Sequence, residues 1–218
     1  GGDVWLGVAY DYRNAVAGSY AYLTMLHELG HAMGLKHSQE AGGVAGVAVP
    51  ANRDALEFTV MSYRSFPGGP LTGYTNGSVD FPTTYMMNDI AAFQAMYGAN
   101  FNTQSGDTVY AWSPTTGAMT LNGVLQAAPA GNRIFMTIWD GGGKDTYDFS
   151  AYATGVQVNL NPGTSSYLGQ AQTAYLGYGH YAQGSVYNAY QYANDPRSLI
   201  ENAIGGSGAD SLLGNAAA

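Results

Sequence analysis

Three of the four histidines in this chain lie within eleven residues, in the segment HELGHAMGLKH. His27 and His31 are four residues apart, so on a helix they share one face and can bind one metal ion. Gly34 stands where helices commonly end in a left-handed residue, and this reversal would let His37 supply a third ligand from another direction. Glu28 is placed to take a proton from a water that the metal activates. The segment therefore predicts a helix that ends near Gly34 and carries a catalytic zinc site.

The length of this pattern decides between a metal site and a helix end that is rich in histidine by chance. A HExxH segment alone occurs by chance in many helices. The full segment requires three histidines, one glutamate and one glycine at fixed positions, in a chain with only four histidines. We therefore predict a zinc site rather than a coincidence.

Hydrophobic spacing predicts the elements around this site. Apolar residues recur at intervals of three and four between Tyr20 and Met33, as on one face of a helix. A β-prone run at residues 4–10 precedes them and predicts a strand. A second helix is expected to begin near Pro82 and to stop at Gly98.

The rest of the chain divides into loops and short strands. Residues 38–56 and 67–81 are rich in Gly, Ala and Pro and predict loops. Beyond about residue 105, Gly and Asn turns separate short alternating segments, which predict β structure. The tyrosine-rich stretch 167–192 is interpreted as half-buried strands. His180, within it, has no partner that the sequence identifies and is expected to be a surface or packing residue.

Composition narrows the class of protein. The formal net charge is −8 with only seven Lys and Arg, which argues against a nucleic-acid partner. The chain has no cysteine, so metal binding must use histidine, carboxylates, tyrosine or carbonyl oxygens. No apolar run reaches the roughly 18 residues that a membrane span needs. The start, Gly1-Gly2-Asp3, is neither a signal peptide nor a natural start, which suggests a fragment or a processed chain.

The segment from His27 to His37 resembles the extended zinc motif of the metzincin metalloproteases. A second segment, residues 59–63 (TVMSY), is similar to the Met-turn of that family, in which Met61 would lie beneath the zinc histidines. The Met-Ser-Tyr form resembles that of the serralysins and astacins, whose tyrosine is an additional, displaceable zinc ligand. The resemblance therefore implies that Tyr63 binds zinc and stabilises the tetrahedral intermediate.

Two positions depart from the serralysin pattern. Proline commonly follows the third histidine, where this chain has Ser38. Met-turns of the form MSYW end here in Arg64. Neither change replaces a metal ligand, so both are expected to affect the shape of the substrate cleft.

The segment from Gly205 to Leu213 fits GGxGxDxUx, the calcium-binding nonapeptide of parallel β-rolls. Its glycines allow tight turns that direct carbonyl oxygens to an ion, and Leu212 is expected to point into the roll. The predicted calcium ligands in this repeat are Gly206, Gly208 and Asp210. A metzincin motif followed by a repeats-in-toxin roll resembles the architecture of the serralysins.

The same resemblance implies a second group of calcium ligands, where the two parts of a serralysin meet. Segments 104–110, 139–145 and 200–202 are similar to the loops that form this junction in the family. An ordinary Gly-rich turn is the alternative for residues 140–145. The ligands implied by the resemblance, several of them through backbone carbonyls, are Gln104, Gly106, Thr108, Asp140, Gly142, Gly143, Asp145, Leu199 and Glu201.

The resemblance implies an α+β fold with two domains. Residues 1–100 would form the C-terminal part of a metzincin zincin-like catalytic domain, and residues 101–218 a calcium-binding parallel β-roll or β-sandwich domain that is expected to be truncated. The earlier strands and first helix of a metzincin are expected upstream of Gly1 or in a separate N-terminal chain. Without them the 218-residue chain alone is expected to be inactive.

The function implied is that of a secreted zinc endopeptidase, with one catalytic Zn²⁺ and several structural Ca²⁺ ions. It would hydrolyse peptide bonds in polypeptide substrates, with Glu28 as general base and His27, His31, His37 and Tyr63 as zinc ligands. Secretion is inferred because β-rolls need calcium at roughly 10⁻⁴ to 10⁻³ M, as extracellular modules do. The alternative is a non-catalytic calcium-binding β-roll module or an inactive protease fragment.

Overall fold

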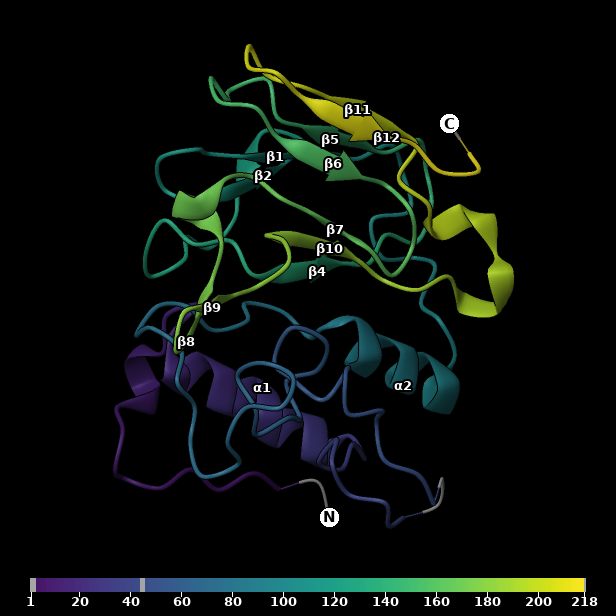
Figure 1. Ribbon diagram of the computed structural model, residues 1–218. Coiled ribbons are helices and arrows are strands. Elements are labelled where there is room, and N and C mark those ends of the chain that lie inside the picture. Colours follow the sequence, from purple (N-terminus) through teal and green to yellow (C-terminus); the bar gives the residue numbers. More distant parts are fainter. Residues whose placement is uncertain (1–2, 44–45, 218) are drawn as a thin grey trace.

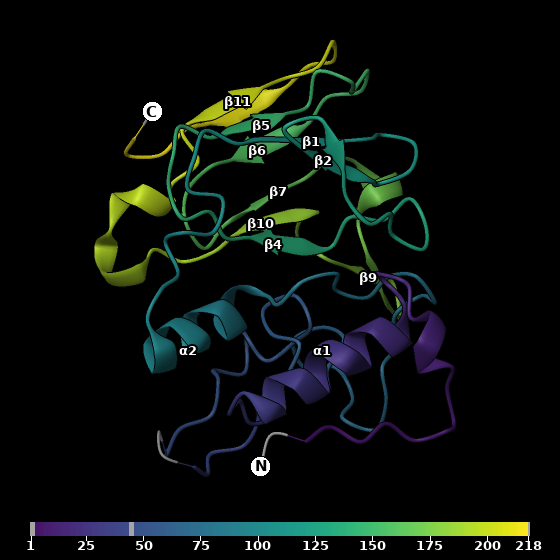
Figure 2. The ribbon, with the colours of Figure 1, turned by 180° about the vertical axis from the view of Figure 1, so that it is seen from behind.

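The computed structural model describes residues 3–43 and 46–217. The helices and long loops of the first hundred residues form one layer, and the strands of the remaining chain form the layers above it (Figure 1). The view from behind shows the same division, with both helices beneath the lowest strands (Figure 2). None of the described helices is long and apolar enough to cross a membrane.

Helix α1 (Tyr20–Ala32) carries the first two motif histidines and confirms the helix predicted there. Ser19 caps its start, where the Ser19 hydroxyl accepts a hydrogen bond from the Tyr22 amide at 3.2 Å. The helix ends at Met33, and Gly34 has a φ of +100°, a left-handed conformation that favours glycine. A short 3₁₀ helix, η1 (Tyr12–Asn14), precedes α1.

Helix α2 (Met87–Tyr97) begins five residues later than the sequence predicted, and it stops at Gly98 as expected. The helix begins later because the residues before it are hydrogen-bonded to residues 135–137 of the second half of the chain. The Thr83 amide donates to the Phe135 carbonyl at 2.9 Å, and the Thr137 amide donates to the Thr84 hydroxyl at 2.9 Å. The predicted loops at 38–56 and 67–81 contain no helix or strand among their described residues; residues 44 and 45 lie outside these.

The expected strand at residues 4–10 was wrong. This stretch has no strand partner within the described residues, and its backbone follows the outside of the helical layer. Trp5 and Val8 are almost fully exposed. A β-prone composition forms a strand only when a neighbouring strand supplies backbone hydrogen bonds and a surface to pack on.

The second half consists of short strands, as predicted. The largest sheet has five strands in the order β11-β5-β1-β2-β3, where β5 is parallel to both β1 and β11, and the β1-β2-β3 pairings are antiparallel. Their bounds are β1 (Val109–Trp112), β2 (Met119–Leu121), β3 (Val124–Leu125), β5 (Thr146–Asp148) and β11 (Asn202–Ile204).

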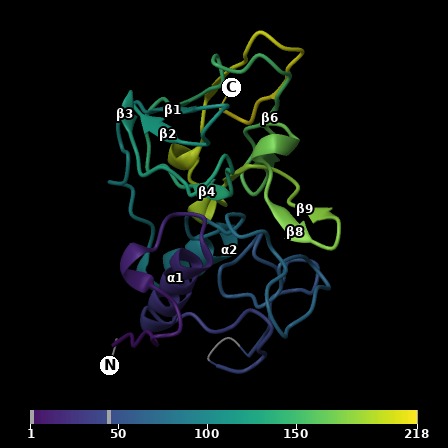
Figure 3. The same ribbon diagram turned by 90° about the vertical axis from the view of Figure 1, so that its left-hand side faces the viewer.

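Three smaller sheets complete the strand layers. They are β4-β10-β7, β12-β6 and the hairpin β8-β9, and the last reaches down to the helical layer (Figure 3). Three short 3₁₀ helices lie between the strands. The bounds are β4 (Met136–Ile138), β6 (Gln157–Asn159), β7 (Ser165–Ser166), β8 (Tyr175–Gly177), β9 (His180–Tyr181), β10 (Val186–Asn188), β12 (Ser211–Leu213), η2 (Gln170–Gln172), η3 (Tyr192–Asn194) and η4 (Pro196–Ser198).

Two hydrophobic cores hold these layers together. One lies among the strands and is rich in aromatic side chains, including Trp112, Tyr147 and Phe149. The other is shared by both halves of the chain: Leu23 and Met61 of the helical layer cluster with Phe135, Leu176 and Tyr187 of the strand layers. Burial of this shared apolar surface positions α1 against a rigid support.

Glu57 forms a buried polar contact between the halves. It is 2% exposed, and its Oε1 accepts hydrogen bonds from the Tyr187 hydroxyl at 2.7 Å and the Gln183 amide at 2.8 Å. Burial raises the pKa of the Glu57 carboxyl. The carboxyl thus satisfies two buried donors that belong to the strand layers.

We predict that Glu57→Ala lowers the free energy of unfolding by about 3 kcal/mol, because it leaves those two donors without an acceptor. Glu57→Gln keeps the Oε1 acceptor and should cost less than about 1 kcal/mol. Chemical denaturation of both variants checks this. Equal losses in the two variants would show that the charge, and not the acceptor, matters.

Candidate metal centre

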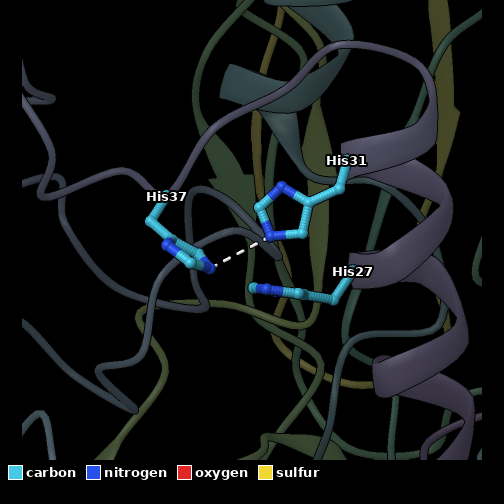
Figure 4. Close-up of side chains that lie close together, drawn as sticks. All are labelled: His27, His31 and His37. Carbon is cyan, nitrogen blue, oxygen red and sulfur yellow. Dashed lines mark hydrogen bonds between the residues drawn. The ribbon is translucent and has the colours of Figure 1, made fainter. Parts of the chain in front are cut away.

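The three motif histidines converge on one point. His27 and His31 project from α1, and His37 projects toward them from the loop beyond Gly34 (Figure 4). One nitrogen from each ring can be chosen so that all three lie within 4.8 Å of one another. His31 Nε2 and His37 Nε2 are 3.0 Å apart.

Each imidazole is held by an oxygen acceptor on its other nitrogen. His27 Nδ1 lies 2.8 Å from the Val60 carbonyl oxygen, and His31 Nδ1 lies 2.9 Å from the Leu35 carbonyl oxygen. His37 Nδ1 lies 2.8 Å from Glu40 Oε1. An oxygen acceptor requires a hydrogen on Nδ1, so each neutral ring presents the lone pair of Nε2 to the others.

This arrangement fits a cation. Two Nε2 lone pairs that face each other at 3.0 Å repel unless a positive charge lies between them. Burial lowers the pKa of His27, which favours the neutral, ligating form of the ring. Three imidazoles with oriented Nδ1 atoms are a donor set that zinc accepts, with further positions left open.

Tyr63 and Glu28 lie beside the three rings. The Tyr63 hydroxyl is 2.7 Å from His37 Nε2, and the Tyr63 and His27 rings stack with centroids 5.7 Å apart. Burial raises the pKa of the Tyr63 hydroxyl. Glu28 and Tyr63 border the same pocket of about 180 Å³, which Tyr20 and Tyr74 also line. A substrate group in this pocket would meet both side chains.

Met61 packs against α1, the helix that carries the first two motif histidines. It is buried, and its side chain meets α1 at Gly30, where an added Cβ would lie 2.7 Å from the Met61 sulfur. Glycine at this position therefore allows the helix to approach the methionine closely.

Sequence reasoning missed two acidic residues of this site. Glu40 orients His37, as described above. Asp89, fully buried in the first turn of α2, accepts hydrogen bonds from the Thr59 hydroxyl at 2.5 Å and the Val60 amide at 2.8 Å. It thereby holds the residue whose carbonyl binds His27. An acidic residue in the first turn of a helix is expected to interact with the helix N-terminus. That expectation did not predict the contact of Asp89 with Thr59 and Val60, about thirty residues away in the sequence.

A second group of predicted ligands meets between the strands and the loop that follows α2. The Asp145 amide donates to Glu201 Oε2 at 2.7 Å, and the Thr108 amide donates to Asp145 Oδ1 at 2.8 Å. Asp140 Oδ2 accepts from the Tyr110 hydroxyl at 2.6 Å. Three acidic side chains are thus concentrated in one small region.

Neighbouring backbone closes around these carboxylates. A Cβ added at Gly143 would lie 2.6 Å from the Gly106 carbonyl oxygen, and one at Gly142 would lie 3.6 Å from the Arg197 carbonyl oxygen. The Thr108 hydroxyl donates to the Gly106 carbonyl at 2.8 Å. Gln104 has a φ of +48°, and Leu199 is buried in the same region as Asp140.

Asp145 has a buried carboxylate oxygen that a cation could satisfy. Its Oδ2 is buried and has no hydrogen-bond partner among the described residues. Burial, together with the nearby charges of Asp140 and Glu201, raises the pKa of Asp145 to about 7. Burial also raises the pKa of Asp140. Carboxylate and carbonyl oxygens in this arrangement suit a hard cation such as calcium.

The predicted ligands of the glycine-rich repeat lie apart from that group. Asp210 Oδ1 accepts from the Val156 amide at 2.9 Å, and a Cβ at Gly206 would meet the Tyr152 carbonyl. Gly208 packs against the backbone of residues 154 and 155 in the same way. Leu212, expected to point inward, is 48% exposed, because β12 is paired with β6 alone within the described chain.

His180 is an exposed residue that also packs, which agrees with the surface or packing role expected of it. Its ring stacks on Phe66, with centroids 3.8 Å apart and an interplanar angle of 13°. The contact joins the β8-β9 hairpin to the loop that follows the Met61 segment.

Comparison with known protein families and curated proteins adds independent information. A family model described as peptidase M10 serralysin C terminal matches residues 99–218. Metalloprotease AprA of Pseudomonas entomophila is 33% identical over 226 residues, which cover 100% of this chain and 42% of that protein. Serralysin C of Dickeya chrysanthemi is 35% identical over 209 residues, 92% of this chain and 38% of that protein. Serralysin A of the same organism is 35% identical over 216 residues, 97% of this chain and 40% of that protein.

These matches cover only part of each relative. The chain spans about two fifths of the length of the curated relatives that it matches.

The raised pKa of Asp145 predicts how metal-free stability depends on pH. Between the usual aspartate value and about 7, the folded chain holds a proton that the unfolded chain has lost, so rising pH destabilises the fold. With a calcium chelator present, the Tm of Asp145→Asn minus the Tm of the unmodified chain should therefore increase as the pH rises from 5 to 8. The expected increase is roughly 2 °C or more.

With excess calcium at pH 8 the difference should reverse, because only the carboxylate can bind the ion strongly. Calorimetry at both pH values, with and without calcium, measures it. A Tm difference that stays constant across pH and calcium would contradict the assignment.

Proposed function

The chain belongs to the serralysin family of peptidase M10, and on this premise we propose that it carries the zinc centre of an endopeptidase. The observation that carries the proposal is the convergence of three oriented imidazoles beside Glu28 and Tyr63. The curated relatives are named as metalloprotease and serralysin, which agrees with hydrolysis of peptide bonds in polypeptide substrates.

We propose that His27, His31 and His37 hold the zinc, with Tyr63 as an additional ligand that can move away. When bound, zinc would supply Lewis acidity, which makes a water more acidic and a peptide carbonyl more electrophilic. The Nδ1 acceptors described above keep the three rings in the ligating orientation.

The chain's own residues would then move the protons. Glu28 would take a proton from the attacking water and transfer it to the nitrogen of the leaving amine. The Tyr63 hydroxyl would donate a hydrogen bond to the oxygen on which negative charge develops. A tyrosine hydroxyl that is not bound to metal is protonated at neutral pH, and so able to donate.

The strand half would serve a structural role through calcium. We propose a catalytic part in residues 1–100, a calcium-binding β-roll domain in residues 101–218, and two groups of calcium ligands. The orphaned Asp145 oxygen supports the first group. The proposed ligands are Gln104, Gly106, Thr108, Asp140, Gly142, Gly143, Asp145, Leu199 and Glu201 in the first group, and Gly206, Gly208 and Asp210 in the second.

A further polypeptide segment would complete the catalytic part. Leu29 and Met33 of the α1 region are partly exposed, and Trp5 and Val8 are almost fully exposed. Exposed large apolar side chains can mark a surface that another segment covers. We propose that this segment, in the same or a separate polypeptide, presents substrate to the zinc site.

The proposed location is extracellular. A β-roll of this kind needs calcium at roughly 10⁻⁴ to 10⁻³ M, which is available outside cells.

A second function is a calcium-binding β-roll module without catalysis. It is favoured by one observation: the family model matches residues 99–218 and not the histidine segment. This alternative predicts calcium-dependent folding, measured by circular dichroism, with no stoichiometric zinc. Elemental analysis that finds one zinc per chain would exclude it.

We predict that Glu28→Gln lowers kcat for casein hydrolysis by at least about 100-fold, because the amide cannot accept the proton from water. The test requires a form of the protein in which the catalytic part is complete. Zinc content should stay at one per chain, because Glu28 is not a proposed ligand. His31→Ala is the paired variant and should lose both zinc and activity. A zinc-loaded, folded protein that cleaves no polypeptide would refute the endopeptidase proposal.

A further inference from the structure

Asp54 lies at the centre of a buried hydrogen-bond network that includes the sequence neighbours of His37 and Tyr63. It is 4% exposed. Its Oδ1 accepts hydrogen bonds from the Ser38 hydroxyl at 2.6 Å and the Ser62 hydroxyl at 2.7 Å. Its Oδ2 accepts from Arg64 Nε at 3.1 Å. One buried carboxylate therefore satisfies three donors from two separate segments.

Each donor is adjacent in sequence to a residue of the metal centre. Ser38 directly follows His37, and Ser62 and Arg64 lie on either side of Tyr63. Across the centre, the Tyr63 hydroxyl lies 2.7 Å from His37 Nε2. Each donor is thus one residue away from His37 or Tyr63. Asp54 therefore links the two side chains that meet at the proposed metal position.

Backbone contacts make this connection stiff. The Ser38 amide donates to the Met61 carbonyl at 3.3 Å, and the Arg64 amide donates to the Ser62 hydroxyl at 3.0 Å. The Tyr74 hydroxyl donates to the Ser62 carbonyl at 2.8 Å. A shift of either segment would break several of these bonds together, so movement at Asp54 would be passed to His37 and Tyr63.

The charges of the network are balanced. Burial of an aspartate is costly unless its charge is paired and its oxygens are hydrogen-bonded, and Asp54 has both an arginine and two hydroxyl donors. Two of these three donors, Ser38 and Arg64, occupy the positions at which the sequence departs from the serralysin pattern. The two residues that depart from the pattern therefore both donate hydrogen bonds to the Asp54 carboxylate.

We propose that Asp54 is a positioning residue that sets the distance between His37 and Tyr63 and so determines the metal geometry. The inference rests on the proposed zinc site. It assigns to Asp54 no contact with metal or substrate. Its effect would pass through Ser38 to the third histidine, and through Ser62 and Arg64 to the tyrosine.

The first test is Asp54→Ala in the protein with a complete catalytic part. Zinc affinity, measured by competition with a chromogenic chelator, should fall by about tenfold, as for other residues that orient metal ligands. The absorption spectrum of the cobalt(II)-substituted protein should change toward that of Tyr63→Phe, because Tyr63 no longer approaches the metal. For casein hydrolysis, kcat should fall while KM stays within about twofold.

Asp80→Ala is the matched control. Asp80 is also buried, and its Oδ1 accepts from Arg133 Nε at 2.7 Å and the Tyr175 amide at 3.1 Å. Its partners lie in the strand layers and not beside a proposed zinc ligand. The substitution should lower Tm by an amount similar to that of Asp54→Ala, but leave zinc affinity and the cobalt spectrum unchanged.

Variants that remove a single donor to Asp54, called single-arm variants below, keep the test decisive if Asp54→Ala fails to fold. Ser38→Ala removes only the arm to His37 and should weaken zinc affinity about threefold, within the range for one lost hydrogen bond. Arg64→Met removes only the arm to Tyr63 and should change the cobalt spectrum with little loss of zinc. In Asp54→Asn, Oδ1 can still accept from both serines, so this variant should lie between the unmodified protein and Ser38→Ala in zinc affinity.

The outcomes separate this inference from the proposed function. Unmodified protein that binds no zinc would refute the zinc site itself. If the unmodified protein binds zinc, and the folded Asp54 or single-arm variants retain its affinity and cobalt spectrum, Asp54 has only a structural role and the inference is wrong.

Discussion

The placement of residues 59–64 beneath α1 is the constraint on which the rest of the metal centre depends. Two buried carboxylates hold this segment, Asp89 from α2 and Asp54 from the preceding loop. The segment in turn supplies the Val60 carbonyl that orients His27 and the methionine that supports the helix. If it moved, one histidine would lose its orientation and the tyrosine would leave the site.

This local arrangement is supported by packing that crosses the whole chain. The core containing Leu23 and Met61 also contains Phe135, Leu176 and Tyr187 from the strand layers. Glu57 adds a buried polar contact across the same boundary. The strands therefore act as a platform for the helical layer and for the histidines of α1.

The two kinds of cation site differ in the chemistry of their donors. The histidine cluster presents neutral nitrogen donors whose orientation is fixed by oxygen acceptors, as zinc prefers. The region around Asp140 and Asp145 presents carboxylate and carbonyl oxygens, and burial is the main cause of the raised pKa of both carboxyls. The proposed zinc and calcium sites are thus distinguished by the chemistry of their donors.

Local sequence determined the parts of this protein that depend on short-range spacing. The interval of four residues between His27 and His31 and the left-handed glycine at position 34 were sufficient to predict helix α1, its end and the three converging rings. The residue pattern of the second half was sufficient to predict short strands, whereas its calcium ligands were implied only by the family resemblance.

Only the tertiary structure decided what surrounds those residues. It placed Asp54 and Asp89 against the Met61 segment, delayed the start of α2, and left residues 4–10 without a strand partner. These outcomes depend on contacts between residues that are distant along the chain. The physical reason is that helical periodicity and turn preferences act over a few residues, whereas buried hydrogen bonds and strand pairing depend on which distant segments meet.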